Sequence, residues 1–277
     1  MSLAFARFRR QIALATGIAF GADKQYLVES RLAPVMRAHG LADFADLVDA
    51  FERGDNDPLM RDVIDALTTN ETFFYRDRTP FENFRTQLLP SLLVSRAKER
   101  RLRFWCAACS TGQEAYSLAM LLENEAAALR GWRLDILATD LSTRAVETAR
   151  NGRYSQFEVQ RGLSTNLLLR HFHRAGASWR VNEHLRARID FRDFSLLSDY
   201  AALGAFDVIF CRNVLMYFEP ETKRAVLARL AGALNESGYL FLGASETAAE
   251  ANAFFSQTTP DGIWQTRRRA QPQLRLA

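Results

Sequence analysis

The feature that most constrains the fold is a change of pattern near residue 102. From there on, short apolar runs that predict strands alternate with amphipathic stretches that predict helices. The predicted strands are residues 102–107, 134–139, 206–211 and 238–243, and the predicted helices are residues 113–128, 143–150 and 219–234. Buried strands that alternate with amphipathic helices are typical of a mostly parallel, doubly wound α/β sheet. Residues 254–258 and 263–266 flank a Pro-Asp-Gly turn and predict a closing antiparallel hairpin.

The first 67 residues carry helical periodicity only. Phe5, Phe8 and Ile12 recur at helical spacing, residues 27–36 and 44–51 repeat the pattern, and Pro58 opens a further helix at a tolerated first-turn position. We expect a small N-terminal all-helical domain with its linker over residues 1–88, and the sheet domain over residues 89–277. Residues 155–190 interrupt the alternation with a helical stretch at 163–172 and strand-like runs at 179–181 and 187–191. We interpret this segment as a small inserted β-subdomain.

Composition removes several classes of protein. No apolar run approaches the roughly 18 residues that a membrane span needs, and residues 9–20 fit an amphipathic helix better than a signal peptide.

Cys106 and Cys109 have the spacing of a redox motif, but they end an apolar run, which favours small buried side chains in a reducing compartment. No metal site is predicted. The formal charge of +4 is modest. Acids outnumber Lys and Arg in the first 67 residues, and besides a basic cluster at residues 267–269 the balance reverses between residues 76 and 103. That stretch is either a set of solvated helix faces or a landing surface for an acidic partner.

Polar residues follow three of the predicted strands, where ligands bind in open α/β sheets. The first turn contains Gly112 and Glu114 but lacks the G-x-G-x-x-G of a dinucleotide site. Glu114 suits a ligand that carries a cation, such as the amino group or sulfonium of S-adenosylmethionine. Asp140 ends the second strand and can accept both hydroxyls of a ribose, unless it caps the next helix instead. Arg212 and Asn213 leave a third, apolar strand and need partners, of which a ligand is one. Together these positions predict a Rossmann-like methyltransferase.

Five motifs carry a more specific resemblance. They are Thr-Asn-Glu-Thr-Phe-Phe-Tyr-Arg at residues 69–76, Ser-Thr-Gly-Gln-Glu-Ala-Tyr-Ser at 110–117, Ala-Thr-Asp-Leu-Ser at 138–142, residues 206–218, and Phe-Leu-Gly-Ala-Ser-Glu at 241–246. In this order they resemble the chemotaxis receptor glutamate methyltransferases of the CheR type. The resemblance covers nearly the whole chain, including the helical front domain and the insertion.

The resemblance implies transfer of a methyl group from S-adenosyl-L-methionine to receptor glutamates, with S-adenosyl-L-homocysteine as product. The implied cofactor-binding residues are Asn70, Thr72, Arg76, Glu114, Asp140, Ser195, Leu196, Asn213 and Val214. Arg76 is a natural partner for the methionine carboxylate, and Tyr217 and Arg212 are the candidate catalytic residues. The implied partner is the cytoplasmic helical domain of methyl-accepting chemoreceptors, with an adaptor protein as a further candidate. The expectation is a cytoplasmic enzyme with no nucleic-acid partner and no membrane insertion.

Two departures from the family pattern qualify the resemblance. Ser195 stands where the family usually has Asn before Leu-Leu, so adenine recognition is expected to fall to Asp193, backbone groups or water. The hairpin at residues 174–179 is short compared with members that dock on a receptor's C-terminal peptide, and the sequence does not predict such a tether.

Other functions stay open from the sequence. The enzyme alternative is a methyltransferase for a nucleic acid or a small molecule, although no basic stripe with stacking aromatics supports nucleic acid. A non-catalytic module that binds the cofactor is a second alternative. A nicotinamide oxidoreductase is disfavoured because the glycine fingerprint is missing.

Overall fold

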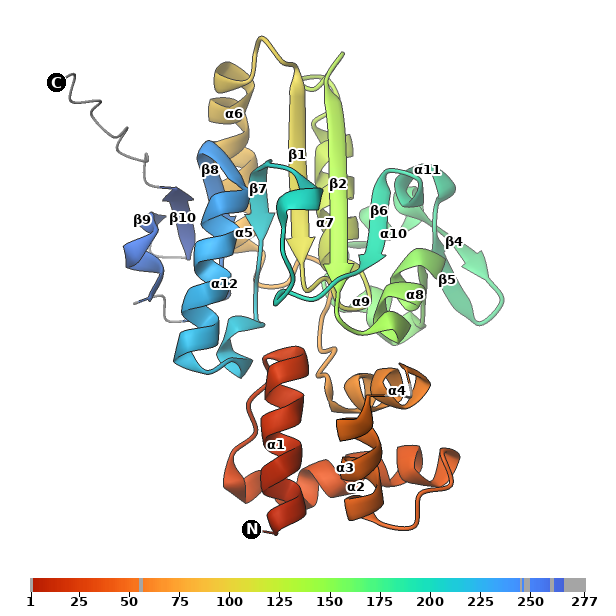
Figure 1. Ribbon diagram of the computed structural model, residues 1–277. Helices are drawn as coiled ribbons and strands as arrows, with labels where there is room; N and C mark the ends of the chain where they lie inside the picture. Colours follow the sequence, from red (N-terminus) through yellow and green to blue (C-terminus); the bar gives the residue numbers. More distant parts are fainter. Residues whose placement is uncertain (1, 55–56, 245, 247–249, 260–261, 267–277) are drawn as a thin grey trace, which may run out of the picture.

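The computed structural model describes residues 2–54, 57–244, 246, 250–259 and 262–266. In Figure 1 the N-terminal helices lie below a larger α/β domain, and the arrowheads of its strands β1 and β2 point toward them. Within the described residues, no helix is both long and apolar enough to cross a membrane.

The N-terminal domain contains the helices that the periodicity predicts. They are α1 (Leu3–Thr16), α2 (Gln25–Ala38), which follows the short η1 (Ala22–Lys24), α3 (Phe44–Arg53) and α4 (Asp57–Leu67). Ser2 and Asp43 cap α1 and α3 because their side chains accept the N–H groups of Phe5 and Asp46. The buried faces of the helices form a separate core of their own, so the prediction of an all-helical unit is confirmed.

Residues 68–100 differ most from the sequence prediction. They contain α5 (Thr79–Asn83), a π-helical turn η2 (Phe84–Leu88) and α6 (Leu89–Ser95), none of which was predicted. Prolines at positions 80 and 90 and the π turn break the 3.6-residue period, so the pattern is hard to recognise. Phe81 and Phe84 pack on the sheet, with ring centroids 6.0 Å from Phe210 and 5.8 Å from Phe104. The predicted linker therefore supplies part of the layer that covers the sheet. The domain boundary between residues 88 and 89 stays a prediction.

The sheet has seven strands in the order β6-β2-β1-β7-β8-β10-β9. Its strands are β1 (Arg101–Ala107), β2 (Arg133–Asp140), β6 (Ile189–Asp193), β7 (Phe206–Phe210), β8 (Leu234–Phe241), β9 (Phe255–Thr259) and β10 (Ile263–Thr266). The first five in spatial order pair in parallel, and β10 and β9 close the edge in antiparallel fashion. The predictions of a doubly wound α/β architecture and of a closing hairpin are confirmed. Residues 260–261 of the hairpin turn lie outside the described residues.

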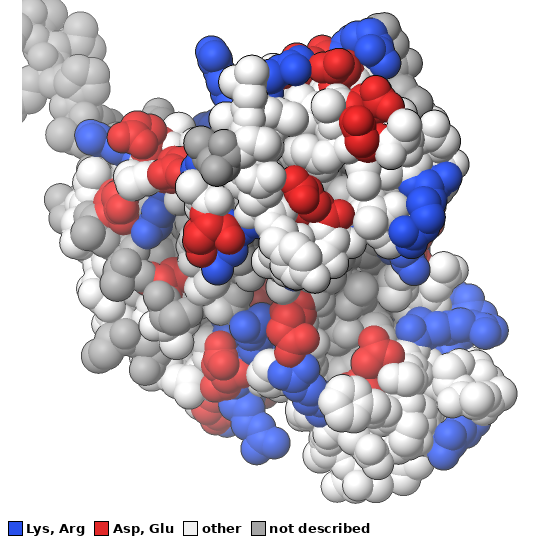
Figure 2. Space-filling view, turned by 90° about the horizontal axis from the view of Figure 1, so that it is seen from below, with Lys and Arg blue, Asp and Glu red and all other residues white. Residues whose placement is uncertain are grey.

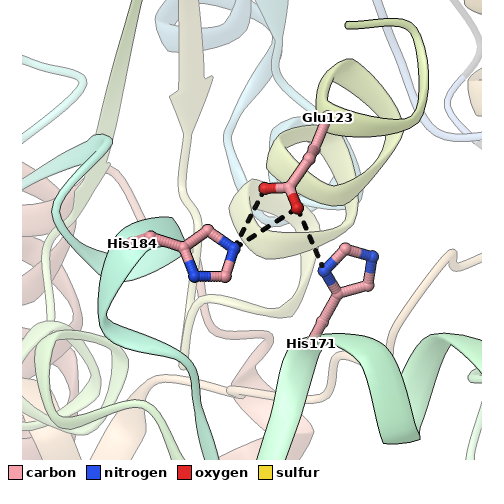
Figure 3. Close-up of side chains that lie close together, drawn as sticks. All are labelled: Glu123, His171 and His184. Atoms are coloured by element: carbon pink, nitrogen blue, oxygen red, sulfur yellow. Dashed lines mark hydrogen bonds and ion pairs between the residues drawn. The ribbon is translucent and has the colours of Figure 1, made fainter.

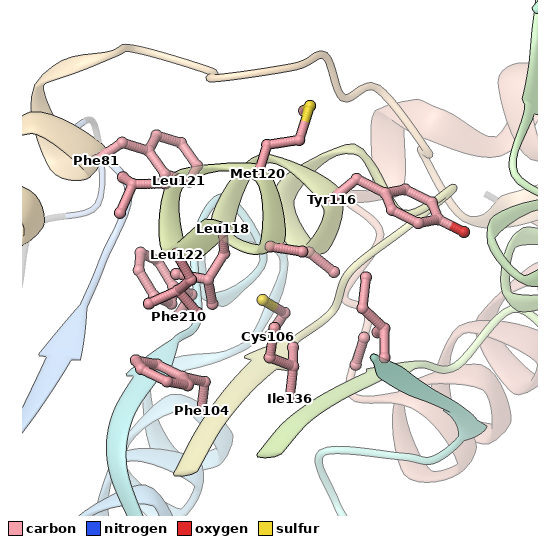
Figure 4. Packing of buried hydrophobic residues seen from close by; sticks show 14 of the residues in the cluster. Phe81, Phe104, Cys106, Tyr116, Leu118, Met120, Leu121, Leu122, Ile136 and Phe210 are labelled. Carbon is pink, nitrogen blue, oxygen red and sulfur yellow. The ribbon is translucent and has the colours of Figure 1, made fainter. Parts of the chain in front are cut away.

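Both faces of the sheet are covered because successive strand residues point to opposite sides. Phe104 and Cys106 of β1 face a core that includes α7 (Gln113–Asn124), whereas Trp105 and Ala107 face a core that includes α12 (Pro220–Ala233). Figure 4 shows the first of these cores, with α7 lying across the strand side chains. The helix α8 (Thr143–Asn151) follows β2, and short 3-10 turns η3 (Ala201–Leu203), η4 (Leu215–Tyr217) and η5 (Glu250–Ala253) complete the connections.

The insertion is a three-stranded antiparallel sheet in the order β3-β5-β4. It consists of β3 (Arg153–Tyr154), α9 (Gln156–Gln160), α10 (Thr165–His171), β4 (Phe172–Ala175), β5 (Ser178–Val181) and α11 (Glu183–Arg186). One assignment was wrong: the strand-like run at 187–191, which we placed in the insertion, forms β6 and pairs with β2 of the main sheet. The pattern of apolar residues identifies a strand, but not which sheet it joins.

Candidate active site

A cavity of about 340 Å³ lies between the helical domain and the carboxyl edge of the parallel strands. Except for Asp193, all of the residues that the sequence suggested for the site contribute to its lining: Asn70, Thr72, Arg76, Glu114, Asp140, Ser195, Leu196, Arg212, Asn213, Val214 and Tyr217. They come from the segment after α4, the first turn of α7, the end of β2, the segment after β6, and the loop and η4 turn after β7. The fold therefore gathers side chains from distant parts of the chain around one space.

The turn after β1 brings backbone donors to this edge. Ala108, Ser110 and Gly112 all have left-handed backbone angles, with φ of 66°, 52° and 96°. Glycine is needed at position 112 because a Cβ there would lie 2.8 Å from the Cβ of Ala149 in α8. The Ser110 hydroxyl donates to the backbone oxygen of Asn70 (3.0 Å), which joins the turn to the segment that follows the helical domain. The turn is thus held tightly against both neighbours.

Asp140 ends β2 and lines the cavity. It is 7% exposed, and each carboxylate oxygen accepts a backbone N–H, from Ser110 (2.7 Å) and from Ser142 (2.9 Å). Ser142, not Asp140, caps α8, because the Ala145 N–H donates to its hydroxyl (3.1 Å). Each carboxylate oxygen keeps acceptor capacity for a ligand hydroxyl. Burial raises the pKa of Asp140, although the backbone donors oppose this shift.

Glu114, in the first turn of α7, and Arg212, just after β7, form a buried ion pair. The Arg212 side chain is 1% exposed and donates to Glu114 Oε2 (3.0 Å), to Asp77 Oδ2 (2.6 Å) and to the backbone oxygen of Arg76 (3.0 Å). Burial raises the pKa of Glu114, and the guanidinium of Arg212 opposes that rise. These bonds engage both terminal nitrogens of Arg212, so its contacts are those of a residue that positions Glu114 and the Arg76–Asp77 turn.

Arg76 lies in the same turn and lines the cavity. Its guanidinium donates to the backbone oxygen of Glu71 (2.8 Å) and lies 5.7 Å from the ring centroid of Phe73. A guanidinium has five N–H donors, so this bond leaves others for a ligand carboxylate. Tyr75 and Asp77 on either side have left-handed backbones, with φ of 51° and 67°. The turn is strained, which is common where a backbone is shaped around a functional site.

Glu246 is a site residue to which the sequence reasoning gave no role. Its carboxylate accepts four backbone N–H groups, from Asn213 (2.8 Å), Val214 (2.9 Å), Leu215 (2.8 Å) and Gly243 (2.7 Å). These bonds fix the loop after β7, in which Asn213 has a φ of 59°. The sequence did contain a signal for this role. Glu246 is an acid that follows an apolar predicted strand, and it ends the motif at residues 241–246 that supports the family resemblance. The neighbouring Ser245 of that motif lies outside the described residues.

Ser195 and Leu196, in the segment after β6, line another side of the cavity. The Ser195 hydroxyl accepts the Leu197 N–H (3.1 Å), so it stabilises a local turn, and Leu196 is buried. Asp193 ends β6, is exposed and does not line the cavity. Of the adenine contacts considered for this wall, Asp193 is therefore not supported by the cavity lining, and backbone groups and water stay the candidates.

Tyr217 lies where the helical domain meets the sheet domain. It is 37% exposed, and its backbone oxygen accepts the Ala19 N–H (2.8 Å) beside a β-bridge between Ile18 and Phe218. The loop after α1 thereby closes one side of the cavity. The sequence did not nominate the helical-domain residues of this wall, which include Thr16, Phe20, Lys24 and Arg31. Their roles depend on domain contacts that helical periodicity does not encode.

Two other expectations can be compared with the structure. Cys106 and Cys109 are buried and free, and burial raises the pKa of both thiols, which agrees with their interpretation as small core residues. In the basic stretch, Arg85 pairs with Glu82, Arg96 with Asp207, and Arg101 with Asp135. These pairs favour local structural roles over a free landing surface.

Comparisons with known proteins agree with this geometry. A family model described as CheR methyltransferase, all-alpha domain, matches residues 3–68, and one described as CheR methyltransferase, SAM binding domain, matches residues 70–262. The chain is 44% identical over 248 residues to chemotaxis protein methyltransferase 1 from Pseudomonas aeruginosa, covering 87% of this chain and 89% of that protein. It is 41% identical over 249 residues to chemotaxis protein methyltransferase Cher2 from Pseudomonas putida, covering 88% and 90%.

Similarity to solved structures is weaker. PKMT2 from Rickettsia typhi in complex with AdoHcy matches 52% of this chain and 20% of that chain, at 17% identity and a TM-score of 0.34. Family assignment rests on the sequence matches, which extend over both domains in order. The chain belongs to the CheR methyltransferase family and uses S-adenosylmethionine as its cofactor.

Proposed function

We propose that this methyltransferase transfers the methyl group of S-adenosylmethionine to side-chain carboxylates of glutamates on chemoreceptors, for adaptation in chemotaxis. The products are a glutamate 5-O-methyl ester and S-adenosylhomocysteine. The observation that carries the proposal is the cavity between the two domains, which gathers every candidate catalytic and cofactor-binding residue except Asp193. The printed names of the relatives, which are chemotaxis protein methyltransferases, support the receptor as substrate.

The chemistry of the lining fits the cofactor group by group. Asp140 offers acceptors for both ribose hydroxyls, Glu114 an anion for the amino group, and Arg76 a cation for the carboxylate. Ser195 and Leu196 would hold the adenine, and Asn70 and Thr72 would complete the polar wall. Asn213 and Val214 would flank the sulfonium, which supplies the methyl group when the cofactor is bound. These assignments remain proposals.

In this proposal the residues of the cavity align the reacting groups and exclude water, and none of them has to transfer a proton. A glutamate with a pKa near 4.3 is already a carboxylate at neutral pH, so the nucleophile requires no general base. Attack on a sulfonium consumes opposite charges, so exclusion of water and alignment should supply most of the acceleration. Tyr217, half exposed at the domain junction, is the candidate for contact with the incoming glutamate. Arg212 acts as a positioning residue in this account, because its terminal nitrogens bind Glu114 and Asp77.

The partner in this proposal is the cytoplasmic helical domain of a chemoreceptor, which places the enzyme in the cytoplasm. An adaptor protein that brings enzyme and receptor together stays a further proposal. Figure 2 shows acidic and basic side chains interspersed over the face seen from below, where the helical domain lies. A mixed surface of this kind favours a protein partner over a nucleic acid, which would require a basic stripe.

Methyl transfer from labelled S-adenosylmethionine tests the proposal. The wild-type chain should label receptor-containing membranes, and mass spectrometry should place the label on glutamate. RNA and a small-molecule carboxylate serve as competing substrates in parallel reactions. Label on RNA alone would replace the proposed substrate, and cofactor binding without transfer to any acceptor would support a non-catalytic module.

A further inference from the structure

A second group of functional side chains lies away from the cofactor cavity. Glu123 near the end of α7, His171 at the end of α10 and His184 in α11 point toward one another (Figure 3). One potential ligand atom from each lies within 4.8 Å of the others. Glu123 follows Glu114 by nine residues, which places it about 14 Å farther along α7 than the cavity wall. The group is therefore distinct from the cofactor site.

Within the described residues, His171 lacks the hydrogen bonds that a buried histidine usually makes. Its side chain is 0% exposed, and within the described residues neither ring nitrogen has a hydrogen-bond partner. A neutral imidazole carries one donor and one acceptor, and burying both unpaired is costly. Glu123 Oε1 is 3.9 Å from Nδ1, too far for a hydrogen bond. The unpaired, buried ring points to a ligand that lies between it and Glu123.

The side chains of Glu123 and His184 reach solvent, whereas that of His171 does not. His184 Nε2 lies 3.1 Å from Glu123 Oε2, and its side chain is 50% exposed. Arg188 reaches the same oxygen at 3.6 Å and would oppose a cation, but its side chain is 46% exposed and can turn into solvent.

We propose that Glu123, His171 and His184 form a binding site for a divalent transition metal, with zinc as the best fit. Two imidazoles and one carboxylate are a donor set that zinc accepts, with water as the fourth ligand. Imidazole donors favour the late first-row metals over magnesium and calcium. Ligands on one tetrahedral zinc lie about 3.4 Å apart, so the three side chains need to approach one another by at most about 1.4 Å.

The bound metal ties the inserted subdomain to the main sheet domain. Glu123 belongs to a helix of the sheet domain, whereas His171 and His184 belong to helices of the insertion. Because the ligands are far apart in the unfolded chain, the metal binds the folded state and stabilises it. The role is structural, and it does not depend on the proposed methylation reaction.

Zinc titration of the full chain, purified without a polyhistidine tag, tests the site. A chromophoric chelator competes for the metal, and wild type is compared with His184→Asn and His173→Asn. His173 is a matched control, since it lies two residues from His171, is exposed and contacts Asn182. We expect one zinc per wild-type chain, binding at least about 10-fold weaker in His184→Asn, and unchanged binding in His173→Asn. Zinc at one hundred times the wild-type Kd should raise Tm by about 5 °C in wild type and in the control, and by about half as much or less in His184→Asn.

Two measurements keep the result interpretable. Cobalt in place of zinc distinguishes the ligands, because thiolate coordination by the cysteines gives an intense charge-transfer band that the proposed site lacks. Glu123→Gln, checked for folding by circular dichroism, provides a second ligand variant. The proposal is overturned if wild type binds no zinc at submillimolar concentration, if a thiolate band appears, or if either ligand variant binds as tightly as the His173 control.

Discussion

At the scale of single residues, the site depends on buried carboxylates whose partners are backbone N–H groups or one arginine. Asp140 and Glu114 are both held in place before any ligand binds, the first by backbone donors and the second by Arg212. Such preorganisation reduces the free energy that ligand binding must spend on ordering side chains. Each carboxylate can therefore be tested by substitution, with stability measured beside ligand affinity.

Asp140→Ala should weaken S-adenosylhomocysteine binding by about 10- to 100-fold, because two charge-assisted hydrogen bonds to the ribose are lost. Asp193→Ala is the control, since Asp193 pairs with Asp140 in register on the neighbouring strand but lies outside the cavity. Calorimetric titration measures both, and thermal unfolding checks that the fold persists. Equal affinity in the two variants would remove Asp140 from the cofactor site.

Glu114→Gln should become more stable relative to wild type as pH rises above about 4.5. The folded-state pKa of Glu114 is raised from its usual value of 4.5, so the folded state holds a proton that the unfolded state has already released. Stability that Glu114 provides at low pH is therefore lost as pH rises through the folded pKa. Urea unfolding of both proteins over a pH series measures the difference, and a difference independent of pH would contradict the assignment.

At the scale of elements, two connecting segments shape the cavity. One is held in place by a single side chain and the other by a single close contact. The loop after β7 is anchored by Glu246, and the end of α1 approaches Phe218. Both connections cross large distances in sequence, which is why neither appears in a local pattern. A substitution that breaks either connection should lower both the stability of the fold and the affinity for the cofactor.

Glu246→Gln should lower the free energy of unfolding by about 2 kcal/mol, because an amide cannot accept four N–H groups as a carboxylate does. Affinity for S-adenosylhomocysteine should fall as well, since Asn213 and Val214 lose their support. Chemical denaturation and titration measure the two effects. Glu236→Gln, at an exposed position in β8, is the control, and a matching response in both variants would argue against the anchoring role.

Gly17→Ala should destabilise more than Gly54→Ala, although both glycines have left-handed backbones, with φ of 79° and 70°. A Cβ at position 17 would lie 2.9 Å from the Phe218 ring, whereas a Cβ at position 54 would meet no atom of the described residues within 4 Å. Backbone strain should cost each variant about 1 kcal/mol, and only Gly17→Ala should also disturb the domain junction. Thermal unfolding together with cofactor titration separates the two contributions. Similar losses at both positions would indicate that the junction does not depend on this contact.

At the scale of the whole molecule, the sequence predicted the alternation of strands and helices because apolar periods of 2 and 3.6 residues are local properties. It also identified Glu114, Asp140, Arg212 and Asn213 as candidates, since strand ends of a parallel sheet meet at one edge. The other candidate site residues came from the family resemblance. It missed α5 to α6, where prolines and a π turn obscure the period, and it placed β6 in the wrong sheet. Those errors, like the missing role for Glu246, concern contacts between segments far apart in the chain, which local patterns do not specify.

A crystal structure with S-adenosylhomocysteine tests the central claim most directly, namely that the cavity between the two domains is the cofactor site. The account predicts the ribose hydroxyls on Asp140, the carboxylate on Arg76 and the sulfur next to Asn213 and Val214. A ligand bound elsewhere, or one in this cavity that leaves Asp140 and Arg76 without contacts, would contradict it.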